Sequence, residues 1–200
     1  MKYRIATLAA LVAAVTTLSA CGSSSSQSAS SPSASASAPS TATAHNAADV
    51  AFATDMIPHH SQAVEMADMA LTKATNADVK SLATKIKAAQ DPEIITMTGW
   101  LKGWSEPVPA ASMSMSGMGE ASGMGMMSDA EMATLDKATG VEFDRMWVKM
   151  MITHHQGAID MSKTELAGGQ DSGAKALAQS IVTSQTAQIS QLQALEKQLA

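Results

Sequence analysis

The chain has 200 residues, a formal net charge of −5 and one cysteine. An acidic chain without a run of Lys and Arg argues against nucleic acid as a partner, and a single cysteine excludes an internal disulfide. Only 3% of the residues are aromatic, so the core must be built from Ala, Leu, Ile, Val and Met. Most of these residues favour helices.

The first 20 residues have the order of an export signal. Lys2 and Arg4 give a positive start, residues 5–18 are mostly apolar, and small residues come directly before Cys21. The apolar run is short for a membrane-spanning helix. The segment also resembles the lipobox of bacterial lipoproteins, which implies a lipid on Cys21 and a position at the extracytoplasmic face of the cell membrane. An ordinary cleaved signal followed by an incidental cysteine is the alternative.

The rest of the chain divides by composition. Residues 21–46 are mainly Ser, Ala, Thr and Pro, too polar to offset the entropy of ordering, and we expect a disordered tether. Residues 47–200 have the length of one compact domain. Within it we place a first repeat at 47–105, a Met-rich linker at 106–127 and a second repeat at 128–200.

The two repeats align without a gap. Placing His59-His60 over His154-His155 gives an offset of 95 residues (154 − 59). Identical pairs at this offset include Asp49/Asp144, Met56/Met151, Ile57/Ile152, Ala63/Ala158, Met66/Met161, Leu71/Leu166, Leu82/Leu177, Ile86/Ile181 and Gln90/Gln185. An internal repeat of this kind defines the architecture of the fold. This pattern indicates a duplication.

Each repeat predicts a helical hairpin. Apolar residues recur at steps of three and four, and Asn76 and Asp171 stand at equivalent turns where each suits a helix N-cap. Two hairpins with wide apolar faces bury them best against each other, so we predict an all-α four-helix bundle. Pro58 and Pro92 each remove a backbone donor and should kink or break the helices of the first repeat.

A shorter helix is expected between the repeats. Ser128 and Glu131 have the spacing of a capping box, and Gly140 marks the end of the segment.

The paired histidines are the first candidate site. Four of the five histidines of the chain form the two matched pairs, and each of the four falls on an apolar-facing stripe. A buried ring nitrogen needs a partner, and a metal ion or a hydrogen bond can supply one. Methionines on the same helices add thioethers, and thioether with imidazole suits Cu(I), while imidazole also accepts Cu(II). The polar residues of the following helices, which could bond the histidines or orient them as ligands, are Gln90, Glu93, Gln185 and Gln188.

The connection between the repeats is the second candidate. Its methionines, which stand among Ser and Gly with few other apolar residues, are Met113, Met115, Met118, Met124, Met126 and Met127. We expect a solvent-exposed thioether cluster that traps a soft metal ion. The alternative is a low-complexity linker that has accumulated methionine.

Signatures of catalysis are missing from the sequence. It contains no Glu-x-x-His pair of a di-iron oxidase, no Gly-x-Ser-x-Gly, no phosphate-cradling glycine loop and no Cys-x-x-Cys. We therefore expect a protein that is not an enzyme.

The twin motifs around the histidines resemble a known family. Residues 55–63 (DMIPHHSQA) and 150–158 (MMITHHQGA) are similar to the family called domain of unknown function 305, and the resemblance covers about residues 46–199. It implies an exported bacterial protein with a ferritin-like bundle, and copper as the bound ion in some members. The candidate ligands that carry over are His59, His60, His154, His155, Met56, Met66, Met151 and Met161.

The sequence thus predicts a lipid-anchored metal-binding protein that binds copper, as Cu(I), Cu(II) or both, in the cell envelope. The alternative is an interaction module that docks an unidentified envelope protein and whose histidines are purely structural.

Overall fold

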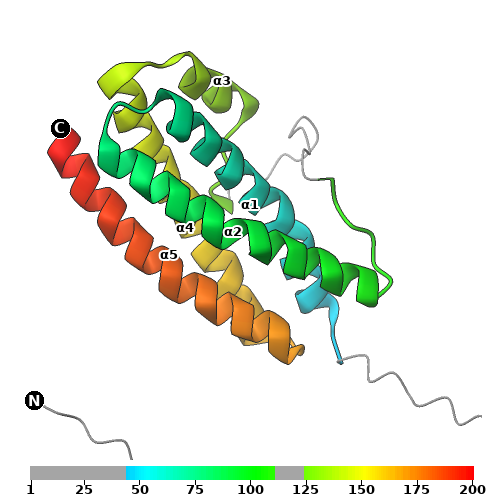
Figure 1. Ribbon diagram of the computed structural model, residues 1–200. Helices are drawn as coiled ribbons and strands as arrows, with labels where there is room; N and C mark the ends of the chain where they lie inside the picture. Colours follow the sequence, from blue (N-terminus) through cyan, green and yellow to red (C-terminus); the bar gives the residue numbers. More distant parts are fainter. Residues whose placement is uncertain (1–43, 111–123) are drawn as a thin grey trace, which may run out of the picture. The chain divides into compact units, whose positions relative to one another are not determined.

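The computed structural model describes residues 44–110 and 124–200. This part of the chain contains five helices and no strand (Figure 1). The helices are α1 (Ala47–Lys73), α2 (Ala77–Gly103), α3 (Asp129–Lys137), α4 (Gly140–Gly168) and α5 (Ser172–Leu199). The all-α prediction is confirmed. No helix within these two ranges has both the length and the apolar character needed to cross a membrane.

The four long helices form two hairpins. Helix α1 packs along α2, and α4 packs along α5, while the hairpins meet mainly through α1 and α4. The outer helices α2 and α5 touch each other far less. The predicted four-helix bundle is present, and its inner pair, α1 and α4, carries all four paired histidines.

The ends of the helices follow the repeat. Helices α1 and α4 end at Lys73 and Gly168, which are 95 residues apart (168 − 73), and α2 and α5 begin at Ala77 and Ser172, which are also 95 apart (172 − 77). Asn76 and Asp171 are the predicted N-caps, and the side chain of each accepts a hydrogen bond from the first turn that follows. The short helix α3 opens with the predicted capping box of Ser128 and Glu131.

Neither helix of the first repeat breaks at its proline. Helix α1 continues through Pro58, and α2 continues through Pro92. Of the kink or break expected at each proline, the break is absent, and a kink there stays a prediction. Each proline removes one backbone hydrogen bond, and packing of a 27-residue helix against its hairpin partner outweighs that local loss.

Two buried aspartates join the hairpins. Asp144 of α4 accepts hydrogen bonds from the backbone N–H groups of Thr75 and Asn76 in the α1–α2 turn. Its counterpart Asp49 of α1 accepts from the N–H groups of Gln170 and Asp171 in the α4–α5 turn. Each hairpin therefore completes the turn of the other hairpin.

A polar layer divides the core into two apolar clusters. Along α1, His59-His60 lie between the members of two clusters, which are Phe52, Ala53, Met56 and Ile57 on one side and Ala63, Met66, Ala67 and Ala70 on the other. Along α4, the second pair lies between Val148–Met151 and Ala158 in the same way. The candidate site is therefore in the middle of the bundle.

Candidate metal centre

The four paired histidines form one buried group. All four side chains are completely buried, although imidazole is polar. The rings of His59 and His154 meet across the α1–α4 contact, with centroids 3.7 Å apart and planes tilted by 37°. His60 and His155 lie farther out, at 6.3 Å and 6.5 Å from their neighbours in sequence. The helical repeat thus brings together residues that are 95 positions apart (154 − 59) in the chain.

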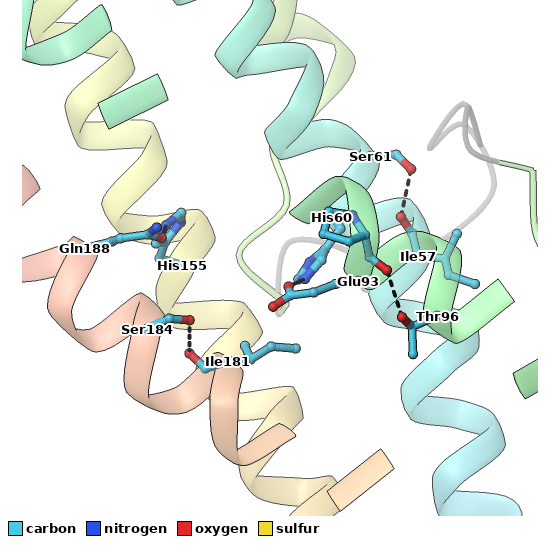
Figure 2. A network of polar contacts seen from close by, with 10 residues as sticks. Ile57, His60, Ser61, Glu93, Thr96, His155, Ile181, Ser184 and Gln188 are labelled. Carbon is cyan, nitrogen blue, oxygen red and sulfur yellow. Dashed lines mark hydrogen bonds and ion pairs between the residues drawn. The ribbon is translucent and has the colours of Figure 1, made fainter. Parts of the chain in front are cut away.

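Each outer histidine bonds the second helix of its own hairpin. His60 Nε2 lies 2.7 Å from Glu93 Oε2 of α2, and His155 Nε2 lies 2.7 Å from Gln188 Oε1 of α5. Figure 2 shows the two pairs, with Glu93 pointing at His60 and Gln188 at His155. The role predicted for Glu93 and Gln188, as partners of the histidines, is therefore seen in the structure.

The inner histidines differ from each other. His59 donates from Nε2 to the backbone carbonyl of Met124 at 3.0 Å. Neither ring nitrogen of His154 has a hydrogen-bond partner in the described part of the chain. The inner pair is therefore only partly satisfied by the protein.

These contacts determine which nitrogen is available. A carbonyl or carboxylate oxygen can only accept, so Nε2 of His59 and of His60 carries the hydrogen, and in a neutral ring Nδ1 then holds a lone pair. Within residues 44–110 and 124–200, the Nδ1 atoms of all four histidines are buried without a partner. An unsatisfied buried polar group costs about 1–3 kcal/mol. These nitrogens are therefore the atoms that a metal ion would satisfy.

Burial also keeps three of the rings, those of His59, His154 and His155, neutral. It lowers the pKa of His59 and of His154 well below the ordinary histidine value, and the neighbouring imidazoles lower it further. Burial lowers the pKa of His155 to about 4, although its hydrogen bond to Gln188 opposes the shift. At neutral pH these imidazoles hold the lone pairs that metal binding requires.

The methionines predicted as ligands lie on both sides of this layer. Met56 belongs to one apolar cluster, Met66 and Met151 belong to the other, and all three are completely buried. Met161 is partly buried and lines a pocket of about 350 Å³ between α1 and α4. Methionine also fills gaps in ordinary hydrophobic cores. The placement of these four residues therefore allows a ligand role without requiring one.

The Met-rich linker is docked where the structure describes it. Met113, Met115 and Met118 lie outside the described residues. Met124 lines the 350 Å³ pocket and Met126 is half-buried. Met127 is only 5% exposed and belongs to the apolar cluster of Met66. The expectation of an exposed thioether cluster is therefore wrong for Met127, because the segment that enters α3 folds onto the bundle.

Two residues that the sequence did not single out hold this segment. The side-chain amide of Gln62 donates to the Met127 carbonyl and accepts from its N–H, both at 2.7 Å. Gly157 of α4 lets the backbone of Met124 approach so closely that a Cβ atom there would overlap it. Gln62 and Gly157 occupy equivalent positions of the repeats (157 − 62 = 95). The repeats differ at this position, two residues after the matched histidines, and this difference is the signal that could have indicated a docked segment.

The histidines do not yet enclose an ion position. Among the described residues, no three His, Cys, Asp or Glu side chains converge as they would around a metal. Gln90 and Gln185, at equivalent positions of α2 and α5, are also buried with unsatisfied amide atoms. Binding would therefore require a turn of the imidazole rings or a thioether as a further ligand.

Fold and site together thus define a class of protein, an all-helical bundle with a buried histidine layer whose ring nitrogens are only partly hydrogen-bonded. The profile of the family described as "Domain of unknown function (DUF305)" matches residues 49–196. The chain belongs to this family. Among curated protein sequences, none matches the chain.

Solved structures similar to the chain include the following three proteins. A candidate secreted DUF305 protein from Streptomyces coelicolor shares 33% identity with a TM-score of 0.68, covering 76% of this chain and 93% of its own. A DUF305 fragment from Deinococcus radiodurans has 29% identity and a TM-score of 0.69, with coverage of 76% and 97%. CopM in its Cu(II)-bound form has 35% identity and a TM-score of 0.65, also with coverage of 76% and 97%. CopM has further been solved with Cu(I) and with Ag.

Proposed function

We propose that this protein binds copper in the cell envelope, to which a lipid on Cys21 anchors it, and that it sequesters the metal rather than catalysing a reaction. The observation that carries the proposal is the set of buried, unpartnered Nδ1 atoms of His59, His60, His154 and His155. Three of these rings have a depressed pKa, and they lie among buried methionines. Neutral imidazole and thioether are the ligands that copper prefers.

The likeness to CopM supports the choice of ion. CopM is crystallised with Cu(II), Cu(I) and Ag, and this chain is 35% identical to it. In our proposal the thioethers of the Met-rich linker capture Cu(I). Met124 connects that linker to the centre, because its carbonyl bonds His59. The four histidines, with Met56, Met66, Met151 and Met161 as candidate thioether ligands, then hold copper in the bundle.

A thermal melt with and without copper tests the binding. A ligand that binds only the folded protein adds about 2.7 kcal/mol at a free concentration of 100 times Kd, which for a domain of this size raises Tm by roughly 5–10 °C. We expect this rise for the wild type under a Cu(I) buffer and its loss in His59→Leu/His154→Leu. His45→Leu is the matched control, since His45 stacks on Trp104 outside the layer, and this variant should keep the rise.

The alternative function predicts a different pattern. If the histidines are purely structural parts of an interaction module, the double variant lowers Tm without metal, and copper leaves the Tm of the wild type unchanged. That result would refute copper binding. The anchor is tested separately: membrane fractionation should recover the wild type with the membrane and Cys21→Ser without it, and equal recovery of both would refute lipidation.

A further inference from the structure

The two outer histidines of the centre are held alike by groups of different charge. His60 and His155 each use Nε2, each at 2.7 Å from an oxygen of the neighbouring helix. That oxygen belongs to a carboxylate in Glu93 and to a neutral amide in Gln188. The two residues occupy equivalent positions of the repeat (188 − 93 = 95). The two outer histidines thus make matching hydrogen bonds (Figure 2), and the charge of the accepting side chain is the difference between them.

The carboxylate changes what its imidazole can bind. A carboxylate that accepts from the distal N–H of a histidine fixes the ring orientation and makes the other nitrogen a stronger donor. For His60 that other nitrogen is Nδ1, which is buried and unpartnered. Glu93 is the one carboxylate that forms an ion pair with any of the four imidazoles in the described part of the chain.

Charge compensation discriminates between oxidation states of copper. A buried ion is costly unless an opposite charge offsets it, and a dication needs that offset more than a monocation does. The His60 half supplies a negative charge at one hydrogen bond's distance, with the Glu93 side chain only 15% exposed. The His155 half supplies a neutral amide. A soft monocation among neutral imidazole and thioether groups suits the second half better.

We propose that the centre has two unequal halves, in which Glu93 is a positioning residue that makes the His60 half favour Cu(II), while the His155 half with Gln188 favours Cu(I). This inference rests on the proposed copper binding. The oxidation state that each half binds is then set by residue 93 of α2 and its counterpart, residue 188 of α5.

The chain itself offers the swap that tests the inference. Glu93→Gln copies the second half into the first, Gln188→Glu does the reverse, and the double variant exchanges them. We expect Glu93→Gln to weaken Cu(II) binding by about 10–100-fold, with Cu(I) affinity changed less than threefold. Gln188→Glu should strengthen Cu(II) binding, and the exchange should restore wild-type Cu(II) affinity. Chelator competition with each ion gives the affinities.

A spectroscopic readout separates positioning from mere stability. The electron paramagnetic resonance spectrum of bound Cu(II) should change in Glu93→Gln and return in the exchange variant. Asp91→Asn is the matched control, because it removes a negative charge from the same turn of α2, where Asp91 faces Lys87 and not the layer. This control should leave both affinities unchanged.

The outcomes are distinguishable. If the wild type binds neither ion, the proposed function fails. If it binds copper but Glu93→Gln weakens both ions equally, weakens neither, or behaves as Asp91→Asn does, the proposed function stands and this inference is refuted. Should Glu93→Gln not fold, Gln188→Glu decides alone, and unchanged Cu(II) affinity in that variant refutes the inference.

Discussion

Replacing Gly157 by alanine perturbs the docked end of the Met-rich linker. Alanine in a helix interior is normally more stable than glycine by about 0.8–1.0 kcal/mol. At position 157, however, the new Cβ would overlap the Met124 carbonyl and lie 2.9 Å from the nitrogen of Gly125. These are backbone atoms, so the segment must move away from α4.

The cost follows from the contacts that the segment makes. Displacing it breaks the His59–Met124 bond and the two bonds between Gln62 and Met127. At about 0.5–1.5 kcal/mol each, these three bonds contribute roughly 1.5–4.5 kcal/mol. Subtracting the gain of about 1 kcal/mol in helix propensity, we expect a net destabilisation of about 0.5–3.5 kcal/mol.

Urea denaturation of the two glycine variants measures this effect against a matched control. Gly99, inside α2, has open space where its Cβ would be, so Gly99→Ala should raise the free energy of unfolding by about 0.5–1 kcal/mol. Gly157→Ala should lower it. The same substitution is thus expected to have opposite signs at two helical positions. If Gly157→Ala stabilises the protein as much as Gly99→Ala does, the docking argument is wrong.

Two further predictions concern buried carboxyl groups. Burial, with the adjacent Asp49 carboxylate adding to it, raises the pKa of Glu165 from 4.5 to about 7. The folded state therefore binds more protons than the unfolded state between these values, and the contribution of Glu165 to stability is full below pH 4.5 and lost as the pH rises through 7. The free energy of unfolding of Glu165→Gln should rise relative to that of the wild type as the pH goes from 5 to 8. If the two free energies differ by the same amount throughout that range, this prediction is wrong. Asp144→Asn weakens the bonds from α4 to the α1–α2 turn, so it should lower the free energy of unfolding in urea by about 1.5–3 kcal/mol. The control Asp136→Asn, at the exposed Lys73 ion pair, should lower it by at most about 1 kcal/mol. Equal losses in the two variants would refute the assigned role of Asp144.

The fold was predictable because its signals are local and occur twice. Periodic apolar residues indicate each helix, and the side chains of Asn76 and Asp171 bond the turns that they were expected to cap. The register of the repeat then places equivalent helix ends 95 residues apart (172 − 77). Pro58 does not break α1, because the cost of the proline is local while the packing that outweighs it is tertiary.

The site was predictable only in its residue types. Repeat and periodicity placed four histidines in the interior, where all four are buried. The contact of the His59 ring with the His154 ring depends on how α1 crosses α4, which no local pattern encodes. The bond from His59 to Met124 depends on the docking of residues 124–127 onto the bundle. The composition of this segment had indicated a solvated linker instead. Whether the buried histidines and methionines ligate copper stays a prediction.

The reciprocal bonds of Asp49 and Asp144 have a consequence for assembly. The buried aspartate of each half bonds the turn of the other half, so this pair of contacts runs in both directions, as contacts do in a symmetric dimer. A chain of half this length, with one His-His pair, could therefore form a similar four-helix bundle as a dimer of two identical subunits. In the fused chain the sequences of the halves are free to diverge, so a glutamate can stand on one side and a glutamine on the other.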